Sequence, residues 1–146
     1  MLAATLASVS LLPGVFSAPL AEVKQNTPLP ILLPAKFDNK GLKLYGSGKG
    51  GPREYQFFLA TRPNCDANVC SVAWFSAFKG GSAYGSRTVK LAKGRKGKYS
   101  PMSCGASCSP ASITWKERGV VYEIQTGKSK TALVKLANSA IKKGPR

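Results

Sequence analysis

The segment 111–126, ASITWKERGVVYEIQT, predicts two β-strands joined by a tight bend, and the rest of the expected fold extends outward from it. Ala111 to Trp115 and Val120 to Thr126 are rich in the β-branched and aromatic residues that favour strands. The residues between them end in Gly119, which can adopt the positive φ that a hairpin bend requires. We therefore expect an antiparallel strand pair here.

The sequence before this pair predicts further antiparallel strands. Leu42 to Tyr45 and Glu54 to Ala60 flank a glycine-rich turn at 46–52 and form a first hairpin. Ser71 to Phe78 and, more briefly, Thr88 to Leu91 continue the pattern. In the run from Ser71 we expect one face to carry Val72, Trp74, Ser76 and Phe78. The aromatic residues expected to supply most of the core are Tyr55, Phe57, Trp74, Phe78, Trp115 and Tyr122.

The two ends of the chain have different patterns. Glu22 to Asn39 is punctuated by prolines, which favours an extended segment along the edge of the sheet. In the tail, apolar residues recur at helical spacing, and Ser129 is placed to cap the helix. Those apolar residues are Leu133, Leu136, Ala137, Ala140 and Ile141. The expected fold is α+β, an antiparallel meander of about five or six strands with one C-terminal helix packed on the sheet, and 22–146 forms a single domain.

The last thirty or so residues resemble a domain of unknown function found in bacterial envelope and anti-sigma-factor-like proteins. The resemblance rests on Trp115, Gly119, Tyr122 and the closing helix with its Leu-x-x-x-Ala-x-Ser pattern ending at Ser139. It implies an exported sheet-plus-helix fold and transfers no catalytic residue.

The N-terminal segment carries no charge as far as Ala21 and resembles a secretory leader. Leu2 to Phe16 would be its apolar region, and the small residues favour cleavage after Ser17, so residues 1–17 are the expected signal peptide, with 21 as the second choice. An uncleaved anchor helix is the alternative, although Pro13 and Gly14 interrupt the run. We expect a secreted or periplasmic protein.

Four cysteines form two close pairs, which favours disulfides in an oxidising compartment. Of the three possible pairings, the local one closes a predicted turn in each case, around Asp66, Ala67 and Asn68 in the first. The expected bonds join Cys65 to Cys70 and Cys104 to Cys108. A zinc tetrahedron is the alternative, but the spacing lacks the two-residue knuckle that is usual in zinc ribbons.

The sequence contains no pattern that indicates catalysis. It has no histidine, which excludes the Ser-His and Cys-His nucleophile systems. Glu117 and Glu123 are the nearest candidate acid/base pair, and each is better explained as a partner for a basic residue. Gly127-Lys128-Ser129 lacks the preceding glycine of a phosphate-binding loop. We expect no enzymatic activity, cofactor or metal.

Charge is the most distinctive feature, because the formal net charge is +16. No acidic residue lies between Asp66 and Glu117, and we expect Lys93 to Ser100 to form a polar, cationic loop beside Tyr84. Basic side chains can neutralise phosphates or sulfates, and tyrosines can stack on a base or a sugar. The candidate polyanion-binding residues are Arg87, Lys90, Lys93, Arg95, Lys96, Lys98 and Tyr99.

These observations favour an exported, non-enzymatic basic module that holds an anionic envelope or extracellular polymer, or a membrane surface, by its cationic loop. We expect no sequence-specific binding of nucleic acid. The alternative is a structural or regulatory envelope protein that binds another protein through an exposed strand edge.

Overall fold

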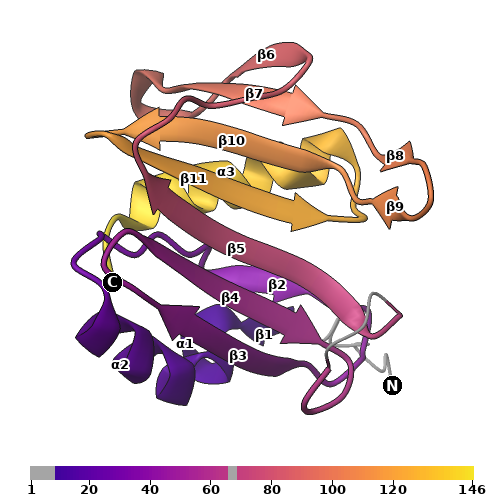
Figure 1. Ribbon diagram of the computed structural model, residues 1–146. Helices are drawn as coiled ribbons and strands as arrows, with labels where there is room; N and C mark the ends of the chain where they lie inside the picture. The colour runs from indigo at the N-terminus through magenta and orange to yellow at the C-terminus, as the bar shows by residue number, and fades with distance from the viewer. Residues whose placement is uncertain (1–8, 66–68) are drawn as a thin grey trace, which may run out of the picture.

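The computed structural model describes residues 9–65 and 69–146, and its centre is an antiparallel sheet of seven strands (Figure 1). The expected α+β class is confirmed, with more strands than the five or six predicted. In order across the sheet, the strands are β3 (Tyr45–Gly50), β4 (Glu54–Ala60), β5 (Ser71–Lys79), β11 (Val120–Thr126), β10 (Ser112–Glu117), β7 (Lys96–Ser100) and β6 (Arg87–Lys90).

The hairpin of β10 and β11 forms as predicted. Its bend places Arg118 at φ 50° and Gly119 at φ 79°, the two successive positive values that the right-handed twist of a hairpin favours. Trp115 lies directly opposite Tyr122, and their stacked rings are 5.6 Å apart between centroids. Both side chains are buried, so this pair contributes a large part of the core beneath the C-terminal helix.

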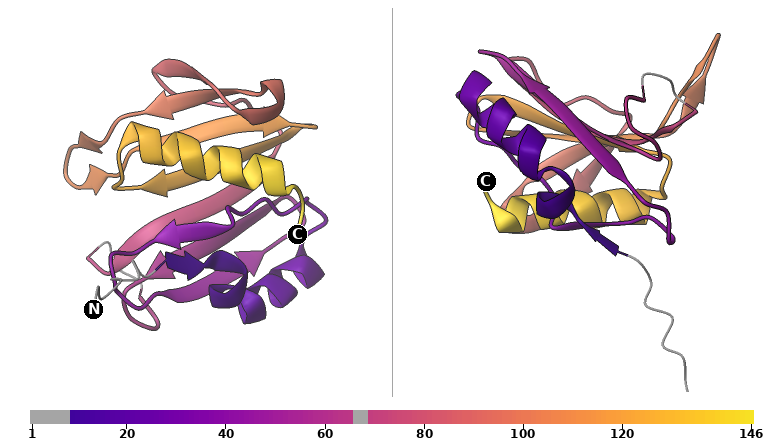
Figure 2. Two further views of the ribbon diagram at one scale, coloured as in Figure 1. Left: turned by 180° about the vertical axis from the view of Figure 1, so that it is seen from behind. Right: turned by 90° about the horizontal axis from the view of Figure 1, so that it is seen from below.

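The C-terminal helix α3 (Lys130–Lys143) packs across β10 and β11 on one side of the sheet, which we call the inner face (Figure 2). The Ser129 hydroxyl caps it by accepting from the Ala132 N–H at 3.2 Å, as predicted. The buried residues of the helix are Leu133, Ala137, Ala140 and Ile141. Leu136, which was expected to be in the same apolar stripe, is only partly buried.

In strand β5 the face that packs on the core is not the one that the sequence predicted. Ala73, Phe75 and Ala77 are buried on the inner face, whereas Trp74 and Phe78 lie half-buried on the outer face. The prediction of Trp74 and Phe78 as core residues was therefore wrong. Both alternating sets of this strand are apolar, so the period of two does not decide between them.

The inner face of β3, β4 and β5 is covered by the N-terminal part of the chain (Figure 2). The covering elements are β1 (Val9–Leu11), α1 (Leu12–Val15), α2 (Ser17–Asn26) and β2 (Lys36–Asp38), with β1 and β2 paired antiparallel. Leu12, Phe16 and Val23 are fully buried. The Phe16 ring lies 5.0 Å from that of Phe57 and 6.1 Å from that of Phe75, between centroids.

The expected signal peptide thus includes residues of the folded core. Its first eight residues lie outside the described part of the chain, but Leu12 and Phe16 fill space above the sheet. A protein cut after Ser17 would lack both side chains. The segment expected to be extended from Glu22 is helical as far as Asn26, and its extended part follows from there.

That extended part, residues 27–35, lies on the inner face and not along the sheet edge. The Tyr122 hydroxyl donates to the Pro30 carbonyl at 2.9 Å, and the Tyr55 hydroxyl accepts from the Leu32 N–H at 3.1 Å. Burial raises the pKa of Tyr122 to about 12, so its hydroxyl stays a donor at neutral pH. Two tyrosines of the sheet therefore fix this segment, and β2 after it, in place.

The glycine-rich segment is a strand, not the turn that was expected. A Cβ on Gly46 would lie 2.7 Å from the Phe16 ring, and one on Gly50 would lie 3.0 Å from the Val23 carbonyl oxygen. Glycine is therefore required at Gly46, and at Gly50 a side chain would displace Val23, because the N-terminal cover approaches β3 so closely.

Both expected disulfides are present, Cys65–Cys70 before β5 and Cys104–Cys108 in a small ribbon of β8 (Ser103–Cys104) and β9 (Cys108–Ser109). Asp66, Ala67 and Asn68, the predicted turn formers of the first loop, lie outside the described residues. Among the residues that the structure describes, no helix is long and apolar enough to cross a bilayer.

Replacing Phe16 with alanine should lower the free energy of unfolding by about 3 to 5 kcal/mol, because the ring is fully buried against Phe57 and Phe75. Ser17→Ala, at an exposed neighbouring position, should change it by about 0.5 kcal/mol or less. Urea unfolding followed by tryptophan fluorescence measures both. Equal midpoints for the two variants would show that the N-terminal segment does not pack on the sheet in solution.

In α3, Leu133→Ala should cost about 2 to 5 kcal/mol, since Leu133 is fully buried against the sheet. Leu136→Ala should cost about 1 kcal/mol, because its side chain is only partly covered. The two variants remove the same atoms from the same helix, so the difference between their urea midpoints reports burial alone. A larger loss for Leu136 would contradict this packing of α3.

Candidate anion-binding surfaces

The candidate polyanion-binding residues lie on a hairpin at one edge of the sheet, not on a loop. Strand β6 is the outermost strand and pairs with β7, and a short 3₁₀ turn, η1 (Ala92–Gly94), joins them. The expectation of a loop over Lys93 to Ser100 was wrong because residues 97–100 pair with β10 and residues 96–99 pair with β6. Glycines and closely spaced basic residues are typical of loops, and they outweighed the alternation of lysines with Gly97 and Tyr99 that is typical of a strand.

Three of these residues share the outer face of the hairpin. Lys90 lies directly opposite Lys96, and Lys98 lies two residues further along the same strand face. Lys90 and Lys96 are exposed, and the Lys98 ammonium donates to the Thr88 hydroxyl at 2.8 Å. We call Lys90, Lys96 and Lys98 the outer lysine cluster. Like charges directly opposite one another in a sheet are destabilising, so this arrangement favours a bound anion.

Arg87 and Tyr99 lie opposite each other on the inner face, away from the outer lysine cluster. The Lys130 ammonium of α3 lies 5.6 Å from the centre of the Tyr99 ring. Lys93 occupies the η1 turn at φ 54° and is exposed. The structure therefore divides the predicted residues between two faces, and Tyr99 cannot stack on a ligand that the outer lysine cluster holds.

Arg95 is the member of the set that already has an anionic partner. Its guanidinium forms an ion pair with Glu117 and donates to the Lys93 carbonyl at 2.9 Å. In residues 9–65 and 69–146 this is the only ion pair. Arg95 therefore holds the end of the hairpin against β10 and has less charge to offer a ligand.

The segment 80–86, which connects β5 to β6, crosses the outer face beside this hairpin. The Tyr84 N–H donates to the Thr114 hydroxyl at 2.9 Å, and that hydroxyl donates to the Tyr84 carbonyl at 2.8 Å. The Lys116 ammonium donates to the Gly81 carbonyl at 2.7 Å. Tyr84 is thereby fixed near β10, with its ring about half exposed.

The two glutamates considered as an acid/base pair lie on opposite faces of the sheet. Glu117 is two residues from the inward-facing Trp115, whereas Glu123 lies opposite Thr114 on the outer face. Burial raises the pKa of Glu123 above its usual value. Its Oε2 atom accepts no hydrogen bond from any residue that the structure describes. The pair cannot act on one substrate.

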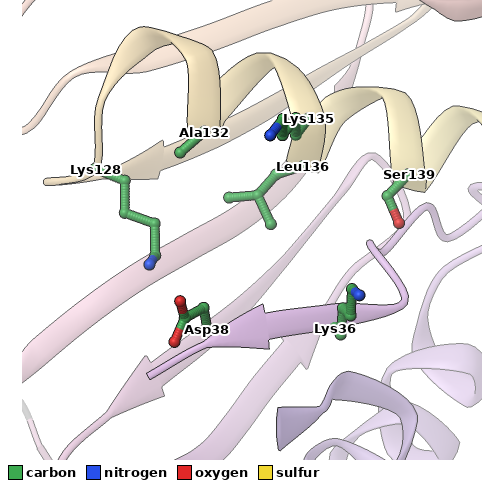
Figure 3. Close-up of a pocket in the computed structure, with 7 residues that line it drawn as sticks. All are labelled: Lys36, Asp38, Lys128, Ala132, Lys135, Leu136 and Ser139. Carbon is green, nitrogen blue, oxygen red and sulfur yellow. The ribbon is translucent and has the colours of Figure 1, made fainter. Parts of the chain in front are cut away.

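A second basic surface, which the sequence did not reveal, lies between β2 and α3 (Figure 3). It is a cleft of about 410 Å³, which we call the β2–α3 cleft. Its lining residues are Lys36, Asp38, Lys128, Ala132, Lys135, Leu136 and Ser139. Lys36 is far in sequence from Lys128 and Lys135, and only the tertiary fold brings it beside them, so no local motif signals the site.

The β2–α3 cleft is closed at one end and open at the other. At the closed end the Ala35 N–H donates to the Ser139 hydroxyl at 3.0 Å, which joins β2 to α3. At the open end Lys128 faces Asp38 across the gap (Figure 3), and a further cavity of about 320 Å³ shares both residues. The Lys128 ammonium lies 4.7 Å from the centre of the buried Phe37 ring, a cation–π contact that holds it at this opening.

Comparison with known proteins identifies no relative. No protein-family model, no curated protein and no solved structure matches this chain. In the part of the chain that the structure describes, no group of three or more histidine, cysteine or acidic side chains could hold a metal ion.

The raised pKa of Glu123 gives a prediction with a definite sign. Because the folded state favours the protonated form, this carboxyl group supports folding in acid, and that support is lost as the pH rises through its folded pKa. Below the usual glutamate pKa of 4.5, Glu123→Gln should have nearly the same pH dependence of stability as the native protein. As the pH rises from there to neutral, the native protein should lose stability relative to the variant. Urea midpoints across this range measure the effect. Glu54→Gln, at an exposed site, is the control, and equal behaviour of both variants would contradict the burial of Glu123.

Proposed function

We propose that this protein is an exported, non-enzymatic module that holds a polyanion on the outer lysine cluster of the β6–β7 hairpin. The observation that carries the proposal is the direct opposition of Lys90 and Lys96. A bound polymer of phosphates or sulfates would offset their repulsion. The two lysines are exposed, so they can approach a polymer without rearrangement of the sheet.

Recognition by this surface depends on charge more than on ligand structure. Lysine ammonium groups are compact point charges. The tyrosine of the hairpin, Tyr99, lies on the other face, and Tyr84, on the outer face, is fixed near β10 by its hydrogen bonds with Thr114. With a net charge of +16, the protein attracts anionic polymers over a distance that salt controls. The proposed partners are phosphate-rich polymers or acidic polysaccharides of the envelope or the extracellular space, bound without sequence specificity.

The disulfides support export, and two further observations support the absence of catalysis. Disulfides persist in oxidising compartments outside the cytosol, and both cysteine pairs are bonded. The sequence has no histidine, and Glu117 and Glu123 point to opposite sides of the sheet.

A protein partner that adds a strand to the sheet is the second candidate function. The outermost strands are β3 and β6, each with a neighbour on one side only. Charged residues protect β6, because Arg87 and Lys90 discourage pairing along this edge. The glycine-rich β3 has less protection and is the edge that this second function would use.

The proposal is tested with a variant that carries Lys90→Gln, Lys96→Gln and Lys98→Gln. Binding of polyphosphate should weaken, and the slope of log Kd against log salt should fall by about 2, because three fewer phosphates are neutralised and each neutralised phosphate of a single-stranded polymer releases about 0.7 counterion. Fluorescence anisotropy with a labelled polyphosphate across a salt series measures both quantities.

The matched control carries Lys24→Gln, Lys49→Gln and Lys79→Gln, three exposed lysines on α2, β3 and β5. It loses the same net charge and should retain most of the salt slope. Equal losses in the two variants would mean that overall charge acts without a site. Native protein that releases polyphosphate at low salt would refute polyanion binding and leave the β3 edge as the better candidate.

A further inference from the structure

The β2–α3 cleft combines a concentration of positive charge with an apolar wall. Lys36 enters from β2, Lys135 from α3, and Lys128 from the turn before α3 (Figure 3). Asp38 is the single acidic residue of the lining, so the cleft carries a formal charge of about +2 at neutral pH. None of the four takes part in an ion pair with another residue that the structure describes.

The apolar wall of the cleft is formed by α3. Leu136 points into the gap between the helix and β2, with Ala132 one turn before it (Figure 3). Leu136 belongs to the apolar stripe of α3, yet it is only partly buried, whereas Leu133 and Ala137 are fully buried. The cleft therefore offers an apolar group of a ligand a surface that the protein itself leaves partly uncovered.

The placement and charge of the lysines indicate the kind of anion. Each lysine presents a point charge with three rotatable donors, whereas arginine would present a planar fork that binds carboxylate and phosphate alike. Ammonium groups that approach from two sides suit a tetrahedral phosphate, whose oxygens point in different directions. A phosphate monoester carries a charge of about −1.5 to −2 near neutral pH, which matches the charge of the cleft.

We propose that the β2–α3 cleft binds a phosphate monoester, with the phosphate between Lys36, Lys128 and Lys135 and the organic group against Leu136 and Ala132. The Ala35–Ser139 hydrogen bond closes one end, and the volume of about 410 Å³ suits a small ligand or the head of a larger one. The contact of Lys128 with the Phe37 ring orients this lysine before the ligand arrives.

This inference is independent of polyanion binding by the hairpin. The outer lysine cluster lies on the outer face of the sheet, whereas the β2–α3 cleft lies on the inner face among the covering elements. Either site can exist without the other, and each can be removed separately.

The test uses calorimetric titration of the full, disulfide-bonded chain with hexyl phosphate, inorganic phosphate and hexanol at low salt. We expect hexyl phosphate to bind one per chain and more tightly than either of the others, because it alone offers both the charge and the apolar group. Amide chemical shifts in NMR spectra should move at Ala35, Ala132 and Leu136. Equal affinity for inorganic and hexyl phosphate, or no binding of hexyl phosphate, would overturn the proposal.

Two variants test the role of charge in the cleft in opposite directions. The cleft variant carries Lys36→Gln, Lys128→Gln and Lys135→Gln and should bind hexyl phosphate about a hundredfold more weakly. Each lysine ammonium in contact with the phosphate in water is expected to contribute about fivefold to the affinity. Asp38→Asn should strengthen it by about fivefold, since it removes a carboxylate that repels the phosphate. Loss of folding cannot produce this gain. Unchanged affinity in Asp38→Asn would contradict the placement of the phosphate in the cleft.

The hairpin variant with Lys90, Lys96 and Lys98 replaced is the matched control, because it loses the same charge. It should bind hexyl phosphate as the native protein does, even if it no longer holds polyphosphate. Equal loss of hexyl phosphate binding in the hairpin and cleft variants would refute a separate site.

Vesicles of phosphatidylcholine with and without phosphatidic acid, a lipid phosphate monoester, distinguish the two sources of the ligand. Binding that requires phosphatidic acid and is lost in the cleft variant would support the proposal with a lipid headgroup as the ligand. Binding of hexyl phosphate without vesicle binding would support it with a soluble phosphate monoester.

Discussion

The structure depends on covering one apolar face of a seven-stranded sheet. Strands lie about 4.8 Å apart, so the sheet is roughly 30 Å wide, whereas a helix with its side chains is about 10 Å across. The helix α3 covers β10 and β11, and it cannot also reach β3 and β4. The N-terminal segments cover the remainder, with Phe16 against Phe57 and Phe75 as the central contact. Without these covering segments the other half of the inner face would be exposed to water.

The β2–α3 cleft lies where these two covers meet. Its two sides come from opposite ends of the chain, joined at the Ala35–Ser139 hydrogen bond and separated further along at Lys128 and Asp38 (Figure 3). Side chains at such a boundary are only partly packed, which is why Leu136 departs from the buried stripe of its helix. The boundary also lies near the surface, so long lysine side chains can place their ammonium groups in water while their stems remain along it. The geometry of the cleft is thus a by-product of how the sheet is covered.

The sequence predicted the features that depend on local chemistry. Gly119 adopts the positive φ of the hairpin bend, Ser129 caps the helix that begins at the next residue, and each cysteine forms a disulfide with another cysteine a few residues away. It did not predict features that depend on what lies above the sheet. In β5 both alternating sets are apolar, so the packing of Phe75 against Phe16 and Phe37, and not the period, decides which face is inside. An uncharged apolar segment has the same composition in an export leader and in a buried cover. The β2–α3 cleft requires Lys36 beside Lys128 and Lys135, and only the fold brings Lys36 there.

The burial of Phe16 also sets an order of events for any processing near the N-terminus. Ser17 is the first residue of α2, and the Leu20 N–H already donates to the Phe16 carbonyl at 2.7 Å. A peptidase binds its substrate as an extended strand, which neither a helical turn nor a fully buried phenylalanine can supply without local unfolding. Cleavage after Ser17 and folding of this segment therefore compete for the same nascent chain. A chain that folds first keeps its N-terminal residues and is protected at that bond, whereas a chain that is cut first must complete its core without them.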